Sequence, residues 1–398
     1  MIHTIFLILM YFSLHANSDK ILFQPWDYGL PCWRIPAAVS VPSAGRILVF
    51  AEGRYSNGDG CYVPNATKKE NNLHHEFHLD EDPCKGYYRN IFYKFSDDDG
   101  QTWSEIRKLA GTNTSCLTDP APVFYEDPVT HETKVLVQYS AKGGTETWQH
   151  VSLNNGDTFD EGTLLNQQLG VGAGKRPGPA GGLFIPKSGR LMYAGYAGRF
   201  DPGVSVWYSD NGGKGWDLAS VVGNSHYDTN KSFENVTESV LVSLPLSGNV
   251  LLSMRVDSSS PRRAALSITS HSSSSVPPLF NESAAPSGAK LPSTSSGDMG
   301  SLLASDTAVY YSMALAPDQG RSHMTVLMSL DDANTWTHGM VVYEGPSAYS
   351  DLTTLTHDEQ SLGIAYERDA DDSATCKGES CIIVFTSIPK NLPPYHHH

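Results

Sequence analysis

The chain has 398 residues, of which 39% are hydrophobic and 18% are charged, so it holds enough apolar side chains for a large buried core and is not extensively disordered. Its 28 Lys and Arg stand against 43 Asp and Glu, giving a formal net charge of −15. This charge argues against nucleic acid or an anionic membrane as the main partner, because either requires a broad basic surface. An anionic ligand would have to be held locally, by a few converging arginines.

The first eighteen residues have the pattern of a secretory signal peptide. Residues 4–14 are apolar over the length of a signal-peptide core, and Ala16 and Ser18 fit a small-x-small cleavage pattern. We therefore expect a signal peptide over residues 1–18, one domain over 19–390 and a short tail over 391–398, with the mature protein secreted or lysosomal. The segment before the apolar core lacks Lys and Arg, so a buried first strand is the alternative. No later stretch approaches the ~20 apolar residues that span a bilayer.

Residues 32–54, "CWRIPAAVSVPSAGRILVFAEGR", predict two half-buried strands joined by a Pro-Ser-Ala-Gly turn. Arg34 and Arg54 lie at their edges, beside apolar runs. In a chain with few cations, this placement marks both arginines as candidates for a specific task.

A polar insertion follows, and it contains several potential metal ligands. These are His74, His75, His78, Asp80 and Glu81. Their spacing matches no strong zinc motif, so we expect a solvated loop, no metal site and no cofactor.

The six cysteines are even in number, which permits disulfides in fifteen full pairings. We expect Cys61–Cys84 to close the insertion and Cys376–Cys381 to close a hairpin tip. Five N-x-S/T sequons agree with the secretory route. They begin at Asn65, Asn113, Asn230, Asn235 and Asn281.

One motif recurs along the chain, and we call its four copies the boxes. They read "SDDDGQTW" at 96–103, "SLNNGDTF" at 152–159, "SDNGGKGW" at 209–216 and "SLDDANTW" at 329–336. The motif predicts a turn in which Asp or Asn bonds the backbone, Gly supplies a positive φ and the aromatic residue fills the gap between strands. The serines are spaced by 56, 57 and 120 residues, so an eroded copy is expected near 267–269, beginning at Ser267.

Around each box the chain reads as short alternating strands separated by Gly, Pro, Asn and Asp. A unit of about 57 residues suits four strands and their turns, and such units arranged radially form a β-propeller. We therefore predict an all-β, six-bladed propeller whose last blade is closed by strands from both termini. The segment "KILFQPW" at 20–26 is the candidate N-terminal strand. The Ser-rich run 257–280 resembles a linker, but the repeat continues through it, and we assign it to loops of blade four.

The segments "WRIP" at 33–36 and "EGR" at 52–54, together with the boxes, resemble the sialidase (neuraminidase) superfamily, where the boxes are known as Asp-boxes. The resemblance implies three arginines that hold the carboxylate of sialic acid, because planar guanidinium groups grip a carboxylate with fixed geometry. The matching positions are Arg34, Arg255 in "ESVLVSLPLSGNVLLSMR" and Arg321 in "DQGRSHMTVLMS". Arg54 would contact the opposite side of the sugar ring.

The same resemblance implies the reacting groups. Sialidases use a tyrosine nucleophile, since a carboxylate would be repelled by the substrate's own carboxylate. Tyr349 in "SAYSDL" matches that position, Glu238 matches its base, and Asp59 matches the acid/base. The segment "TDPAPVFYED" resembles the lining of the C5-substituent pocket, with Asp119 as a contact.

The expected activity is therefore that of a retaining exo-α-sialidase acting on sialylated glycans of glycoproteins or glycolipids, or on related acids such as KDN. The alternatives are a non-catalytic propeller that binds sialoglycans, and a trans-sialidase. A pure binding module has no reason to keep three arginines together with Tyr349, Glu238 and Asp59.

Overall fold

The fold is built almost entirely from β-strands. The structure is a computed structural model that describes residues 19–55, 84, 87–169, 175–196, 203–222, 236–256, 263–268, 298–316, 320–370 and 381–395. Within these ranges the helical elements are three short 3₁₀ turns, at Asp27–Gly29, Pro42–Ala44 and Lys142–Gly144. The all-β prediction is confirmed.

The strands of the first three blades pair antiparallel within each sheet. Blade one contains β2 (Cys32–Val41), β3 (Arg46–Arg54), β4 (Arg89–Ser96) and β5 (Arg107–Ala110). Blade two contains β6 (Thr118–Glu126), β7 (Thr133–Ala141), β8 (Glu146–Ser152) and β9 (Thr163–Leu164). Blade three contains β10 (Arg176–Pro177), β11 (Leu183–Ile185), β12 (Arg190–Tyr196), β13 (Val204–Ser209) and β14 (Asp217–Val222).

The remaining blades follow the same order, except that two of them share a strand. Blade four contains β15 (Val236–Ser243), β16 (Val250–Val256) and β17 (Arg263–Ile268). Blade five contains β18 (Ser301–Ala304), β19 (Val309–Ala314), β20 (Ser322–Ser329) and the first half of β21 (His338–Thr354). Blade six contains the second half of β21, then β22 (Ser361–Arg368), β23 (Ile382–Pro389) and β1 (Lys20–Phe23).

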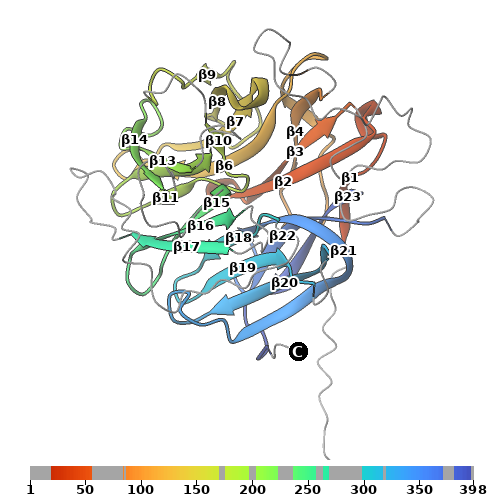
Figure 1. The fold of residues 1–398 in the computed structure, drawn as a ribbon, viewed down its shortest axis with the longest axis vertical. Coiled ribbons are helices and arrows are strands. Elements are labelled where there is room, and N and C mark those ends of the chain that lie inside the picture. Colours follow the sequence, from red (N-terminus) through yellow and green to blue (C-terminus); the bar gives the residue numbers. More distant parts are fainter. Residues whose placement is uncertain are drawn as a thin grey trace, which may run out of the picture.

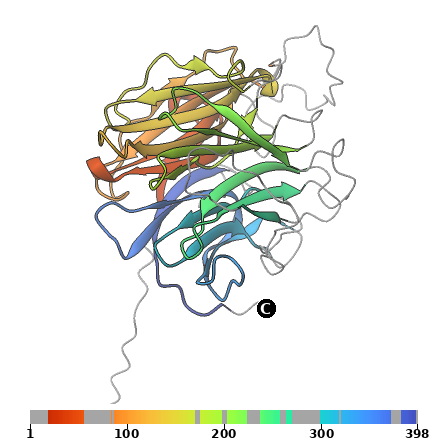
Figure 2. The same ribbon diagram turned by 90° about the vertical axis from the view of Figure 1, so that its left-hand side faces the viewer.

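The six blades surround a common centre (Figure 1). In the perpendicular view of Figure 2, blades one and two lie on the opposite side of the molecule from blades five and six. Residue pairing of β20 with the first half of β21, and of β22 with its second half, makes blades five and six one seven-stranded sheet. The predicted six-bladed propeller is confirmed.

The last blade is closed by strands from the two ends of the chain. The N-terminal strand β1 pairs antiparallel with β23, with Lys20 opposite Phe385 and Ile21 opposite Val384 (Figure 1). The predicted role of segment 20–26 is therefore confirmed for its strand residues 20–23. Residues 393–395 hydrogen-bond with Thr337 and Gly339, so this part of the expected tail lies against blade five.

Apolar side chains fill the space between neighbouring blades. One cluster packs Leu48 and Phe50 of blade one against Val135 and Val137 of blade two. These side chains are fully buried, and each contributes about 1.5–3 kcal/mol relative to exposure to water. The clusters hold the blades in register, which in turn fixes the positions of side chains at their ends.

The boxes form the turns that the sequence predicts. In the first box, the amide of Gly100 donates to Ser96 Oγ at 2.8 Å and the amide of Thr102 donates to Asp98 Oδ1 at 2.8 Å. The same pair of contacts recurs in the other three boxes. The residue before the Gly also joins blades: Asp99 accepts the amides of residues 356, 357 and 358, in the β21–β22 turn of blade six.

The eroded box does not begin at Ser267. In every intact copy the box serine pairs with the first apolar residue of the blade's second strand, as Ser96 does with Ile47. In blade four the corresponding residue, Val250, pairs with Ile268. The position of the box serine is therefore residue 268, one later than predicted, and an isoleucine occupies it. Ser267 is not equivalent to it, because adjacent strand residues face opposite sides of the sheet. Residues 269–297 lie outside the described residues.

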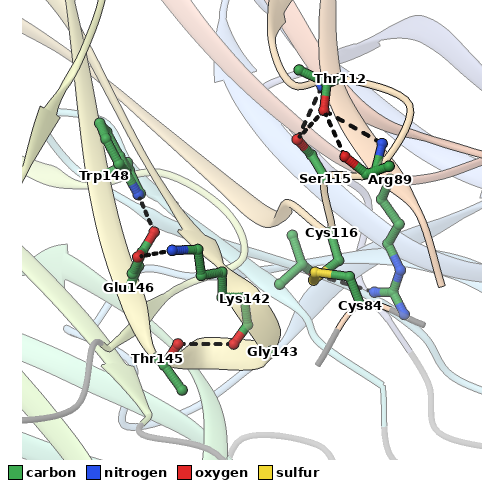
Figure 3. Close-up of a disulfide and its surroundings, with 12 residues drawn as sticks. Cys84, Arg89, Thr112, Ser115, Cys116, Lys142, Gly143, Thr145, Glu146 and Trp148 are labelled. Atoms are coloured by element: carbon green, nitrogen blue, oxygen red, sulfur yellow. Dashed lines mark hydrogen bonds and ion pairs between the residues drawn. A yellow bond between two sulfur atoms is a disulfide. The ribbon is translucent and has the colours of Figure 1, made fainter. Parts of the chain in front are cut away.

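The expected Cys61–Cys84 disulfide is wrong, because Cys84 pairs with Cys116 (Figure 3). The physical reason is a contact between blades: Arg89 hydrogen-bonds through its backbone with Ser115 and Leu117, which places the start of β4 beside the segment leading into β6. The two Cα atoms are 5.2 Å apart. Cys376 lies outside the described residues, so the Cys376–Cys381 pairing stays a prediction.

In the described part of the chain, no helix has the length and apolar character needed to cross a membrane.

Candidate active site

Four of the innermost strands begin with the same backbone irregularity. In β2, β6, β15 and β21, an advance of three residues pairs with an advance of only two residues on the neighbouring strand. This irregularity is a β-bulge. Bulges redirect side chains and are frequent beside active sites. Asp119, Glu238 and Tyr349 lie within three of these bulges, and Arg34 directly precedes the fourth, so one repeated geometry brings four polar side chains to the same end of the propeller.

Tyr349 and Glu238 form the centre of the site. The Tyr349 hydroxyl donates to Glu238 Oε1 at 2.5 Å, although the two residues are 111 positions apart. Arg255 Nη1 donates to Glu238 Oε2 at 2.8 Å and to the Tyr349 hydroxyl at 3.1 Å. Both Tyr349 and Glu238 are 7% exposed. The arrangement supplies a buried phenol, a carboxylate able to take its proton and a cation beside both.

The other two predicted triad arginines also lie against this tyrosine. The guanidinium carbon of Arg34 is 5.1 Å from the centre of the Tyr349 ring, and that of Arg321 is 5.7 Å away. The Arg321 carbonyl accepts the amide of Ser347, which anchors it two residues before the tyrosine. The structure thus brings Arg34, Arg255 and Arg321 together from blades one, four and five.

The electrostatic environment of Tyr349 combines opposing influences. Burial raises the pKa of its phenol well above the ordinary value, and the neighbouring Glu238 carboxylate raises it further. Arg255, Arg34 and Arg321 act in the opposite direction and lower this pKa. The phenol is therefore protonated at rest, and it donates its hydrogen bond to Glu238.

Arg34 is held by a carboxylate that the sequence did not identify. Glu367 on β22 accepts Arg34 Nε at 3.1 Å and Nη2 at 2.9 Å, and it also accepts the amide of Ile35 at 2.7 Å. Ile35 has a φ of 59°, a left-handed conformation that is uncommon for a β-branched residue. Glu367 thus fixes both the arginine and the strained bulge. An acidic residue in the apolar strand "SLGIAYER" was the available signal.

Arg54 lies in a second polar cluster. Its Nε and Nη2 donate to Glu52 Oε2 at 3.0 and 2.7 Å, and Arg89 Nη1 lies 3.6 Å from the same oxygen. Arg54 thus pairs with Glu52, whereas Arg34, Arg255 and Arg321 contact Tyr349, and the expected contact of Arg54 with the sugar ring stays a prediction.

Asp119 is the fourth bulge residue and is 4% exposed. Its Oδ2 has no hydrogen-bond partner among the described residues. Burial, and then the charge of Glu52, raise the pKa of this carboxyl to about 7, while Arg176 and Arg89 act to lower it. Asp119 therefore exchanges a proton in the neutral range.

The predicted acid/base Asp59 lies outside the described residues, as do the histidines of the polar insertion. The sequons at Asn65, Asn230, Asn235 and Asn281 lie outside them too, whereas Asn113 is exposed in a turn. No group of three or more potential metal ligands occurs within the ranges that the structure describes.

Comparison with known proteins places this chain in a family. The sequence matches the family described as the BNR repeat-like domain over residues 91–361. A sialidase from Micromonospora viridifaciens is 28% identical over an alignment of 374 positions, which covers 85% of this chain and 50% of the relative. The chain belongs to the sialidase superfamily. It spans about half the length of that curated relative.

Solved structures of sialidase-superfamily proteins share the fold of this one. The NanB sialidase from Streptococcus pneumoniae has a TM-score of 0.67 at 17% identity, over 95% of this chain and 71% of that chain. The intramolecular trans-sialidase from Ruminococcus gnavus has a TM-score of 0.66 at 14% identity, over 95% of this chain and 98% of that chain. At these identities, the likeness shows that this chain and the two solved structures share the propeller fold.

Proposed function

We propose that this protein is a retaining exo-α-sialidase that releases terminal sialic acids, or related nonulosonic acids such as KDN, from glycoconjugates. The observation that carries the proposal is the buried contact between Tyr349 and Glu238, with three arginines around it. A propeller that only binds sialoglycans needs the arginines but has no use for a phenol paired with a base.

The proposed first step forms a covalent glycosyl-enzyme. The Tyr349 oxygen attacks C2 of the sugar while its proton passes to Glu238, and the bond from C2 to the leaving oxygen breaks. We propose that Asp59 gives its proton to that oxygen. Arg34, Arg255 and Arg321 hold the substrate carboxylate, which fixes C2 opposite the phenol.

The proposed second step releases the sugar with retained configuration. Asp59, now a carboxylate, removes a proton from water as the water oxygen attacks C2. The bond to Tyr349 breaks, and the phenolate takes its proton back from Glu238. Two inversions at C2 make the first product the α-anomer.

We also propose that the protein works in the secretory pathway, as a secreted or lysosomal enzyme on sialylated glycans. The Cys84–Cys116 disulfide supports this compartment, because structural disulfides persist in oxidising environments.

Trapping the intermediate tests the mechanism. A 3-fluoro sialosyl fluoride, or its KDN counterpart, should label Tyr349, because the fluorine at C3 slows both steps while the good fluoride leaving group keeps the first step fast enough for the adduct to accumulate. Peptide mass spectrometry should find the label on the peptide containing "SAYSDL". Tyr349→Phe should abolish labelling and lower kcat by at least about a thousandfold.

A matched control is Tyr343→Phe, because Tyr343 lies on the same strand and also donates to a carboxylate, that of Asp369. This variant should still be labelled and active. A label on Glu238, or a first-formed β-anomer by NMR, would contradict the assigned roles. Failure to cleave both a fluorogenic sialoside and its KDN analogue between pH 3.5 and 8 would refute the activity.

A further inference from the structure

A fully buried carboxylate organises the side of the site that carries Arg54. Glu52, on β3, has no exposed surface. One of its oxygens, Oε2, accepts both donors of Arg54 and lies beside Arg89. Burial acts to raise the pKa of Glu52, but Arg54 and Arg89 outweigh it, so the pKa stays below its ordinary value and the group is ionised.

The other oxygen of Glu52 reaches into the next blade. Oε1 accepts the Thr118 hydroxyl at 2.5 Å and the Asp119 amide at 2.9 Å. Asp119 has a φ of 59°, the same left-handed conformation as Ile35. Glu52 therefore binds an arginine with one oxygen and the bulge of β6 with the other.

This arrangement repeats the one around Glu367. There, too, a buried carboxylate on a second strand holds an arginine and the amide of a left-handed bulge residue in the following blade. Glu367 binds Arg34, which faces Tyr349, whereas Glu52 binds Arg54. Both carboxylates accept a bulge amide. They differ in the arginine: Arg34 precedes the bulge and contacts both oxygens of Glu367, whereas Arg54 lies on the strand of Glu52 and contacts only Oε2.

Asp119 is surrounded by charged groups from several elements. These are Glu52 on β3, Arg89 on β4, Arg176 on β10 and Glu238 on β15, and the Tyr196 phenol on β12 also lies within its field. Because the backbone amide of Asp119 is tied to Glu52, the position of the Asp119 carboxyl depends on that bond. Because Glu52 is ionised, its charge also opposes ionisation of Asp119.

We infer that Glu52 is a positioning residue of the active site: its carboxylate fixes Arg54 and the Asp119 bulge relative to each other, without touching the substrate. This inference rests on the proposed function, since it assigns Arg54 and Asp119 to the sugar-ring side of that site. Loss of the carboxylate should weaken substrate binding more than it slows the chemical step at Tyr349.

Two substitutions distinguish the effect of the length of the Glu52 side chain from the effect of its charge. Glu52→Asp keeps the charge but is one methylene too short to hold both partners, so KM should rise about 5- to 50-fold while kcat falls less than about threefold. Glu52→Gln keeps the length and removes the charge. It should also raise KM. We expect Asp119 to give kcat/KM an inflection near pH 7 in the wild type, and this inflection should move to lower pH in Glu52→Gln. In Glu52→Asp that inflection should stay in place.

Thr118→Val provides a milder variant in case Glu52→Gln does not fold. It removes one bond between Glu52 and the bulge, leaves the charge, and should raise KM about 2- to 10-fold. Asp99→Asn is the matched control, because it weakens an inter-blade contact at the other end of the propeller and should leave KM and the pH profile unchanged.

The outcomes are distinguishable. If the Glu52 and Thr118 variants melt at lower temperature but keep the wild-type KM and pH profile, Glu52 is merely structural and the inference is wrong. A wild-type protein that neither binds nor cleaves any sialoside overturns the proposed function, and this inference with it.

Discussion

The two ends of the propeller differ in what repeats from blade to blade. At the box end, sequence and contacts repeat together: each box serine accepts the amide four residues later. At the bulge end, the backbone irregularity repeats in β2, β6, β15 and β21, but the side chains differ completely. An aspartate, a glutamate and a tyrosine lie within three of the bulges, and an arginine directly precedes the fourth.

This difference separates the work of the two regions. Box residues bond their own turn or the turn of the neighbouring blade, so their contribution is to stability. Bulge residues meet partners from other blades, as Tyr349 meets Glu238. Substitutions at the bulges should therefore change kinetics with little effect on stability, and substitutions in the boxes should do the reverse.

The largest effect on KM is expected for Arg34. Arg34→Lys cannot reproduce the bidentate contact with Glu367 or a bidentate grip on a carboxylate, because an ammonium group is a point charge. Loss of one charge-assisted hydrogen bond costs about 1.5–3 kcal/mol, which corresponds to roughly a 10- to 150-fold rise in KM. Steady-state kinetics on a fluorogenic sialoside measure this. An unchanged KM would remove Arg34 from the carboxylate site.

A box substitution should give the opposite pattern. Asp99 accepts three backbone amides and the Thr356 hydroxyl from blade six. Asp99→Asn replaces one acceptor oxygen by a donor, so the free energy of unfolding should fall by about 1–3 kcal/mol. Denaturant unfolding measures this loss, and kcat and KM should remain at wild-type values. Altered kinetics in a folded variant would contradict the separation between the two ends.

Acidic groups at the two ends should respond to pH in opposite directions. Burial raises the pKa of Asp351, on the inner strand β21, to about 7. For Asp99, burial acts to raise the pKa, but hydrogen bonds from Thr356 and His357 outweigh it and lower the pKa. A raised folded-state pKa gives stability that is present at low pH and lost as pH rises from about 4 to 7, whereas a lowered one gives stability that is lost as pH falls below about 4.

Melting temperatures between pH 3 and 8 test both signs. The wild type should be several degrees more stable near pH 5 than near pH 8. Asp351→Asn still accepts the Ala38 amide and should flatten the alkaline side of the curve. Asp99→Asn should flatten its acid side. A wild-type curve that rises steadily from pH 5 to 8 would show that Asp351 is ionised without cost.

The smallest effect concerns the one box in which alanine replaces glycine. Ala333 has a φ of 64°, and relief of this conformation by Ala333→Gly stabilises the fold by about 1–2 kcal/mol. Its methyl group is fully buried, and losing it costs about 0.8 kcal/mol or more. The two terms nearly cancel, so denaturant unfolding should show a change below about 1 kcal/mol.

The reverse substitution sharpens this prediction. In Gly156→Ala, the new Cβ would lie 2.3 Å from Leu48 Cδ2 of blade one, at a φ of 79°. Strain and overpacking then add, and a loss of about 2–4 kcal/mol is expected. Equal effects of the two substitutions would mean that the boxes tolerate a side chain at this position regardless of the neighbouring blade.

Repetition explains which parts of this structure the sequence could predict. The boxes recur every 56 or 57 residues in the first three copies, so blade number and order follow from the sequence alone. Arg255, Glu238 and Tyr349 lie in segments that resemble a known family, and the structure brings them together. Glu367 could not be found in this way, because it meets Arg34 from 333 residues away and no local pattern marks the pairing.

Pairings across blades were also the source of the errors. The partner of Cys84 is decided by the backbone contact between Arg89 and Ser115, which belong to different blades. The eroded box lies one residue later than predicted, because the strand register places Ile268 opposite Val250. Sequence spacing alone does not fix that register.

The 17-residue strand β21 has a consequence for how the ring comes apart. Because its first half pairs with β20 of blade five and its second half with β22 of blade six, these two blades form one sheet, whereas the other blades form separate sheets. Blades five and six should therefore open as a single cooperative unit in hydrogen exchange. Tyr349 sits in this unit, while Glu238 and Arg34 do not. Partial opening of the ring would thus separate Tyr349 from Glu238 before either blade lost its own strand pairing.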